Sequence, residues 1–220
     1  MKFEQLVSIA LCAIGLYSID QPACGLDLSV PAVRGDVSRT ALGDGTGVVV
    51  GVIDSGVDDT HPALAGVDSL GQPRLLAEAN FVGTEPGNTG DDVVGHGTQV
   101  ASVIASRDAQ FTGLAPDSRF VNARVLDSSN GFPNDLQVRD GIGFAIDQGA
   151  DVLNLSLNYF GIFSSGNQQL DYMIDWAAEE MGISTAVCVG NISQGTGAPV
   201  VRGPGGAFNG ITVGRTDFDF

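Results

Sequence analysis

Residues 47–53, with the sequence GVVVGVI, contain only glycine and aliphatic side chains, and the run ends on a carboxylate, Asp54. A segment this short and this apolar is typical of a strand that is buried on both faces. Such a strand requires a sheet that helices cover on both sides. The charge at its end needs an explanation. A turn is one, because Asp54-Ser55-Gly56 is good turn chemistry, and a functional site is the other.

The rest of the chain alternates between short apolar segments and longer segments with a helical period. Further strands are predicted at 119–126, 151–157, 183–190 and 210–214, and helices at 97–107, 133–148 and 167–181. This order predicts an α/β fold, a mostly parallel, doubly wound sheet with helices on both faces, and no second domain or internal repeat is visible. In such a fold, binding sites form beyond the carboxyl ends of the strands, where Asp54 and Asn191 both fall.

The segment 151–157 departs from the pattern of a strand that is buried on both faces. Three leucines alternate with polar residues along it, namely Leu153, Leu155 and Leu157 with Asn154, Ser156 and Asn158. One interpretation is an edge strand that is wetted on one side. The other is the wall of a cleft that offers hydrogen bonds to a ligand.

Charge and the N-terminal residues limit the partners of the chain. Ten Lys and Arg residues against 26 Asp and Glu residues give a net charge of −16, which argues against binding to nucleic acid. Residues 1–25 resemble a signal peptide, because the apolar run 6–19 is too short to span a bilayer comfortably and small residues follow at 23–25. We therefore expect a secreted or periplasmic protein with no membrane contact after signal removal. A buried N-terminal helix is the alternative.

Cysteine usage predicts no internal disulfide framework. Of the three cysteines, Cys12 and Cys24 lie in or beside the leader, and only Cys188 falls within the expected fold. A cysteine in the apolar segment TAVCVG is most simply a small buried side chain.

The segment Gly95-His96-Gly97-Thr98 places a histidine immediately before a predicted helix. The positive end of the helix dipole would favour the neutral imidazole, which is the form that a general base needs. A carboxylate on the second ring nitrogen would fix the tautomer and stabilise the imidazolium formed later. Asp54 is the candidate for that carboxylate.

Four short motifs, VIDSGV, GHGT, LNLSL and VGN, occur here in the order and approximate spacing found in the subtilisin-like serine proteases, the subtilases. The chain resembles that family from about residue 29 to residue 217. The resemblance implies the Asp, His, Ser chain order of a catalytic triad. It makes Asp54 the orienting acid, His96 the general base and Asn191 the amide that stabilises the oxyanion.

The resemblance also implies substrate contacts along two segments. Residues 128–131 would be a strand-like segment, and residues 156–158 would lie beside the specificity pocket, so that both pair with an extended peptide. The implied substrate-binding residues are Ser128, Ser129, Asn130, Gly131, Ser156, Leu157 and Asn158. The implied partner is a polypeptide in extended conformation, and no cofactor and no metal are implied. Ala63 stands where many relatives carry an acidic calcium ligand, which weakens the case for calcium there.

The nucleophile of the family has no counterpart in the sequence. The family carries it in a Gly-Thr-Ser segment well after the strand that matches 210–214, and residues 215–220 contain no serine. Ser55, Ser102 and Ser193 adjoin matched motifs but do not occupy its place. We therefore expect residues 26–220 to be part of a subtilase catalytic domain, a fragment that is inactive alone.

Two other functions remain open. Several acids and both histidines could gather a divalent metal for hydrolysis, although their spacing matches no ligand motif: Asp54, Asp58, Asp59, His61, Asp91, Asp92 and His96. Alternatively, the chain is a non-catalytic subtilase-like module that binds extended peptides.

Overall fold

Six parallel strands form one sheet in the part of the chain that the computed structural model describes, which is residues 26–85, 87, 89–131, 134–158, 168–190 and 201–214. The strands are β1 Val49–Asp54, β2 Leu75–Asn80, β3 Arg119–Arg124, β4 Val152–Leu155, β5 Ser184–Cys188 and β6 Ile211–Val213. Their order across the sheet is β2-β3-β1-β4-β5-β6, and every neighbouring pair is parallel. β1 lies between β3 and β4, and all six of its residues are buried. The apolar run that precedes Asp54 in β1 is therefore the sequence of a central strand.

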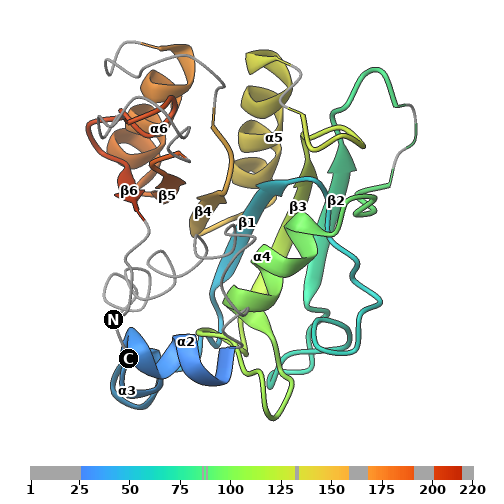
Figure 1. The fold of residues 1–220 in the computed structure, drawn as a ribbon, viewed down its shortest axis with the longest axis vertical. Helices are drawn as coiled ribbons and strands as arrows, with labels where there is room; N and C mark the ends of the chain where they lie inside the picture. The colour runs from blue at the N-terminus through green and yellow to red at the C-terminus, as the bar shows by residue number, and fades with distance from the viewer. Residues whose placement is uncertain are drawn as a thin grey trace, which may run out of the picture.

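Helices cover both faces of this sheet, as the alternating pattern predicted. The helices are α2 Leu26–Ala32, α3 Gly35–Leu42, α4 His96–Ala105, α5 Asp135–Asp147 and α6 Gln169–Met181. Figure 1 shows α4 in front of β1 and β3, with α5 and α6 on the opposite face.

The side chains of β1 belong alternately to two hydrophobic cores. Val50 and Val52 belong to the core that includes Ile104 of α4, whereas Val49 and Ile53 belong to the core that includes Ile142 of α5. The predicted doubly wound α/β fold is thereby confirmed.

Three elements were not predicted from the sequence. β2 carries Glu78 and Asn80 in the sequence LLAEAN, and it lies at the edge of the sheet, where five of its six residues are only partly buried. α2 and α3 have seven and eight residues, and α2 contains Pro31. Short, polar or proline-containing elements depend on tertiary contacts, such as the hydrogen bond from the Arg39 guanidinium to the carbonyl of Gly113 at 2.5 Å.

The edge-strand interpretation of residues 151–157 is wrong. β4 pairs with β1 on one side and β5 on the other, and all four of its residues are buried. The side chain of Asn154 donates to the hydroxyl of Ser156 at 3.1 Å, while its Oδ1 atom is buried with no hydrogen-bond partner among the described residues. Asn154 is therefore enclosed within a central strand, while Ser156 and Asn158 are half-buried beyond its carboxyl end.

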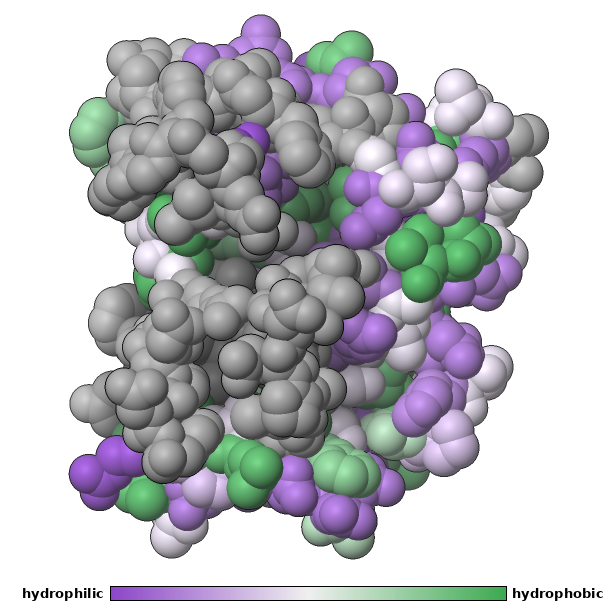
Figure 2. Space-filling model, viewed as in Figure 1, coloured by the Kyte–Doolittle hydropathy of each residue, from purple (hydrophilic) through white to green (hydrophobic). Residues whose placement is uncertain are grey.

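The outer surface of the described residues is mixed in polarity. Figure 2 shows hydrophilic and hydrophobic residues interspersed over the described part of one face. Within the described residues, no helix has the length and apolar character needed to cross a membrane. Residues 1–25 lie outside that part, so the boundary at residue 25 and the signal peptide stay predictions.

Candidate active site

Asp54 and His96 are in direct contact at the carboxyl edge of the sheet. Asp54 is the last residue of β1 and His96 is the first residue of α4. The Nδ1 atom of His96 lies 2.6 Å from Oδ1 of Asp54, a distance typical of a charge-assisted hydrogen bond. The Asp54 side chain is 0% exposed and the His96 side chain 18% exposed. The sequence predicted this contact, and it leaves a partly accessible imidazole held by a fully buried carboxylate.

Backbone groups fix Asp54 within the edge of the sheet. Its carbonyl oxygen accepts hydrogen bonds from the amides of Val125 and Leu126 at 2.7 and 3.2 Å. Its Oδ1 atom also accepts the amide of Ser55 at 2.7 Å. The Oδ2 atom is buried with no hydrogen-bond partner among the described residues. The carboxylate therefore has a defined orientation, with Oδ1 directed at the imidazole.

Two glycines allow the helix that carries His96 to start against the end of β1. Gly95 is the N-cap of α4 at φ 92°, a left-handed conformation that other residues rarely adopt. Gly97 is buried, and a Cβ atom at this position would lie 2.0 Å from the carbonyl oxygen of Gly56 and 3.2 Å from Cβ of Asp54. Close backbone approach at these glycines was expected, and it brings the imidazole within reach of the carboxylate.

Replacement of Gly97 by alanine is expected to lower the free energy of unfolding by about 1–3 kcal/mol, because the added methyl group would overlap the carbonyl of Gly56. Chemical denaturation measures this loss. Gly143→Ala in the middle of α5 is the matched control, since nothing lies within 4 Å of its Cβ position. That substitution is expected to stabilise the protein by up to about 1 kcal/mol. Equal effects at the two glycines would contradict the close approach.

Two carboxylates control the ionisation of His96. Burial alone would lower its pKa, but the hydrogen bond and charge of Asp54 and the charge of Asp92 outweigh burial and raise the pKa above its usual 6.5. The helix N-terminus was expected to favour the neutral form, and the two carboxylates act in the opposite direction. The helix dipole is a partial charge, whereas two full negative charges lie nearby. The environment favours the imidazolium, the form that a general base acquires during a reaction.

The segment 156–158 is attached to the end of β5, beside the dyad. Leu157 is buried, and its carbonyl oxygen accepts a hydrogen bond from the Cys188 thiol at 3.1 Å. The Asn158 amide lies 3.4 Å from the same sulfur atom. Cys188 is free and buried, as predicted. Asn191 follows three residues later but lies outside the described residues, so its place in the site stays a prediction.

Residues 128–131 form a turn rather than the strand-like segment that was expected. The carboxylate of Asp127 accepts the amides of Ser129 and Gly131 at 2.9 and 2.8 Å, and the Asp127 amide donates to the Gly131 carbonyl. Asn130 adopts a left-handed conformation at φ 57°. Glu85 accepts the amide of Ser128 at 2.8 Å. The four residues lie after the carboxyl end of β3, and their contact with substrate stays a prediction.

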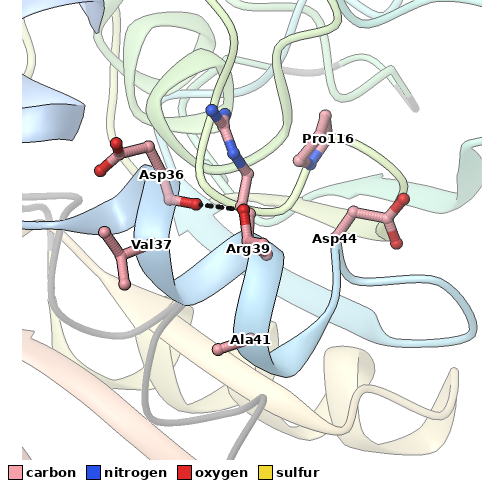
Figure 3. Close-up of a pocket in the computed structure, with 7 residues that line it drawn as sticks. Asp36, Val37, Arg39, Ala41, Asp44 and Pro116 are labelled. Atoms are coloured by element: carbon pink, nitrogen blue, oxygen red, sulfur yellow. Dashed lines mark hydrogen bonds between the residues drawn. The ribbon is translucent and has the colours of Figure 1, made fainter.

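A surface pocket of about 590 Å³ lies elsewhere, between α3 and Pro116 (Figure 3). Asp44 and Pro116, which line it, precede β1 and β3, so the pocket is at the amino ends of strands whose carboxyl ends carry the dyad. Its lining residues are Asp36, Val37, Arg39, Thr40, Ala41, Asp44 and Pro116. This pocket lacks a histidine and is not part of the candidate active site.

The seven acids and histidines of the alternative metal site do not converge. All seven are described, and no three His, Cys, Asp or Glu residues of the described ranges form a group that could hold a metal ion. Asp54 and His96 pair with each other, while Asp58 accepts the amide and hydroxyl of Thr60 at 3.0 and 2.6 Å. The geometry gives the metal-dependent hydrolase no support.

Sequence analysis missed the role of Asp92, which it considered only as a metal ligand. The structure places its carboxylate under the first turn of α4, where the amide of Thr98 donates to it at 2.8 Å. A carboxylate a few residues before a helix start is a capping signal that could have identified it.

Comparison with known proteins relates residues 45–218 to the subtilase family, whose sequence profile matches them. Thermitase from Thermoactinomyces vulgaris is 32% identical over 80% of this chain and 57% of its own length. The minor extracellular protease Vpr from Bacillus subtilis (strain 168) is 31% identical over 87% of this chain and 23% of its own. A solved structure of a cold adapted subtilisin-like serine proteinase has a TM-score of 0.60 and 29% identity, covering 79% of this chain and 56% of that one. The chain thus spans less than two thirds of the length of each of these relatives.

Proposed function

The chain belongs to the subtilase family, and from that membership we propose that it contributes the acid and the base of a serine endopeptidase. The observation that carries the proposal is the contact of 2.6 Å between His96 Nδ1 and Asp54 Oδ1 at the carboxyl edge of the sheet. Asp54 accepts a hydrogen bond from Nδ1–H of His96, which keeps the proton on Nδ1 and leaves Nε2 as the proton acceptor. His96 then takes the proton of a serine hydroxyl and returns it to the leaving amine.

The charges around His96 support this order of proton transfers. A general base becomes an imidazolium while the serine attacks, and Asp54 and Asp92 both stabilise that cation. The partial exposure of His96 gives a substrate access to the imidazole, whereas the full burial of Asp54 preserves the strength of their hydrogen bond.

We further propose that the substrate is a polypeptide in extended conformation. Ser156, Leu157 and Asn158 follow the carboxyl end of β4, the neighbour of β1, and contacts with Cys188 hold this segment to β5, which supports a place for it beside the dyad. Residues 128–131 occupy the corresponding position after β3. Asn191 is proposed to donate its amide to the oxyanion, as in the family.

The nucleophilic serine is proposed to lie outside these 220 residues, because no serine among them occupies the family position. We therefore expect the purified 220-residue chain to hydrolyse no peptide substrate and to give no labelling with a serine-directed covalent probe. Loss of the serine costs subtilisin, a member of the family, on the order of 10⁶ in kcat. Mass spectrometry of the probe-treated chain measures labelling directly, and peptide cleavage is followed by fluorescence.

The informative comparison is a protein that continues in the same reading frame beyond Phe220 and includes a Gly-Thr-Ser segment. That longer protein is expected to react with the probe and to cleave peptides. Specific labelling of the 220-residue chain, lost on Asp54→Asn, would contradict the proposed place of the nucleophile. A reading frame that stops at Phe220 would favour the non-catalytic peptide-binding module instead.

We also propose export from the cytoplasm. The proposal depends on the apolar run 6–19 and the small residues at 23–25. The relative named as an extracellular protease is in keeping with it. N-terminal sequencing of the exported protein would show whether cleavage occurs near residue 25.

A further inference from the structure

The carboxylate of Asp92 accepts five hydrogen bonds around the start of α4. Its Oδ1 atom accepts the hydroxyl of Ser55 at 2.9 Å and the amides of Val94 and Gly95 at 3.0 and 2.8 Å. Its Oδ2 atom accepts the amide and the hydroxyl of Thr98 at 2.8 and 2.6 Å. Burial acts to raise the pKa of Asp92, but the hydrogen bonds from Thr98, Gly95 and Val94 outweigh it and lower the pKa. The side chain is therefore an anion whose two oxygen atoms are both used.

Asp92 supplies the helix cap that the N-cap residue itself lacks. Gly95 has no side chain to accept the free amides of the first turn. The amide of Thr98 is satisfied by Asp92, and the amide of Gly97 by the Ser55 hydroxyl at 2.9 Å. A negative charge at this end of the helix also complements the helix dipole. The first turn of α4, which begins with His96, is thus held in place by hydrogen bonds to the side chains of Ser55 and Asp92.

Ser55 joins this cap to the carboxylate that His96 contacts. Its hydroxyl donates to Asp92 and accepts from Gly97, while its amide donates to Oδ1 of Asp54. Ser55 is fully buried. A closed circuit of hydrogen bonds therefore runs from Asp54 through Ser55 and Asp92 to the first turn of α4, and back from His96 to Asp54.

We propose that Asp92 is a positioning residue that holds the His96 imidazole against Asp54, acting through Ser55 and the amides of the first turn of α4. The importance of this positioning for proton transfer rests on the function proposed above, whereas the positioning of the imidazole itself does not. The same contacts explain the presence of a carboxylate at residue 92, in the loop before α4. Without it the amides of Val94, Gly95 and Thr98 would lose their acceptor, and the first turn could rotate away from Asp54.

Among the described residues, the charges that raise the His96 pKa come from two segments, the end of β1 with Asp54 and the loop before α4 with Asp92. From β5, the Cys188 thiol is near enough to Asp54 to be affected by its charge, and burial raises the pKa of that thiol, which keeps it neutral. Ser55 carries no charge, so removal of its hydroxyl would not alter a purely electrostatic effect of Asp92 on His96. It would weaken a positioning effect, because that effect is transmitted through Ser55.

Nuclear magnetic resonance of the 220-residue chain separates these roles without any assay of hydrolysis. The sequence has two histidines, so a His61→Gln variant assigns the imidazole signals of His96. In Asp92→Asn we expect a lower His96 pKa and faster solvent exchange of the Nδ1 proton. In Ser55→Ala, which keeps the charge of Asp92, we expect exchange of that proton to be faster on the order of fivefold, the weight of one hydrogen bond.

The matched control is Asp108→Asn after the far end of α4. Its carboxylate also accepts two backbone amides, those of Gln110 and Phe111 at 2.9 and 2.8 Å, so the chemical change is the same. It should leave the Nδ1 exchange of His96 unchanged. If Asp92→Asn does not fold, Ser55→Ala decides the matter.

Two results together would overturn the positioning role: an unchanged exchange rate of the His96 Nδ1 proton in Ser55→Ala, and an effect of Asp92→Asn on the His96 pKa that added salt removes. Asp92 would then act on His96 only through its charge. Failure of the longer protein to cleave peptides would instead reject the proposed function and leave these spectra unaffected. The two failures are therefore distinguishable.

Discussion

Replacement of His96 by alanine is expected to lower kcat on the order of 10⁶-fold in a protein that joins these 220 residues to the nucleophile segment. That magnitude is the loss seen in subtilisin, where serine and histidine act as one unit. The physical reason is that His96 is the one described side chain that hydrogen-bonds to the Asp54 carboxylate, so no other described side chain on that carboxylate can accept the serine proton. Steady-state hydrolysis of a peptide substrate gives kcat, and unchanged KM would show that binding survives.

His61→Ala is the control for this substitution. His61 is exposed, and its Nδ1 atom accepts the amide of Ala63 at 3.2 Å in a local turn. Activity within about twofold of the parent is expected for that surface change. Equal losses for both histidines, or substantial activity without His96, would show that the dyad is not the proton-transfer site.

The overall architecture could be predicted because its signals are local. The strand at 47–53 has no polar residue, and a buried central strand is one of few structures that accept such a run. The helix predicted at 167–181 is observed at Gln169–Met181 and ends at Gly182, whose φ is 67°. Periodicity and a glycine stop signal were sufficient there.

The edge of the sheet and the N-terminal helices could not be predicted because their stability comes from distant contacts. Among the described strands, β2 pairs only with β3, and its register is interrupted between Leu75 and Ala77. α3 is held in part by Arg39, which reaches the carbonyl of Gly113 from far away in the sequence. Neither contact leaves a periodic signal in the residues of the element itself.

The candidate site, too, could be predicted only in part. The Asp54–His96 contact followed from two motifs at the ends of predicted elements. The influence of Asp92 on the His96 pKa did not, because Asp92 lies in turn-like sequence, and it adds to the larger effects of the hydrogen bond and charge of Asp54. The helix dipole is visible in the sequence, whereas the anion that caps this helix is visible only in the structure. The proximity of two carboxylates in three dimensions raises the His96 pKa against the effect of burial.

Asp54→Asn is expected to reduce kcat by about 10⁴-fold in the longer protein, because an amide that donates to Nδ1 selects the wrong imidazole tautomer. Asp58→Asn, an exposed acid in the following loop whose carboxylate accepts from Thr60, should change kcat little. A loss in Asp54→Asn no larger than in Asp58→Asn would exclude Asp54 as the orienting acid.

The same substitution should change how stability depends on pH, and the 220-residue chain is sufficient to measure it. The pKa of His96 is raised in the folded chain, so the stabilisation from its charged form is fully present below the usual value of 6.5 and is lost as pH rises through the raised pKa. Of the two carboxylates that raise the His96 pKa, Asp54 has the larger effect, so Asp54→Asn lowers that pKa. The parent should therefore exceed the variant in unfolding free energy by more at about pH 5.5 than at about pH 9, as measured by denaturant titration. A difference that grows with pH instead would mean that Asp54 does not stabilise the imidazolium, and the proton could then not be held at His96 during acyl transfer.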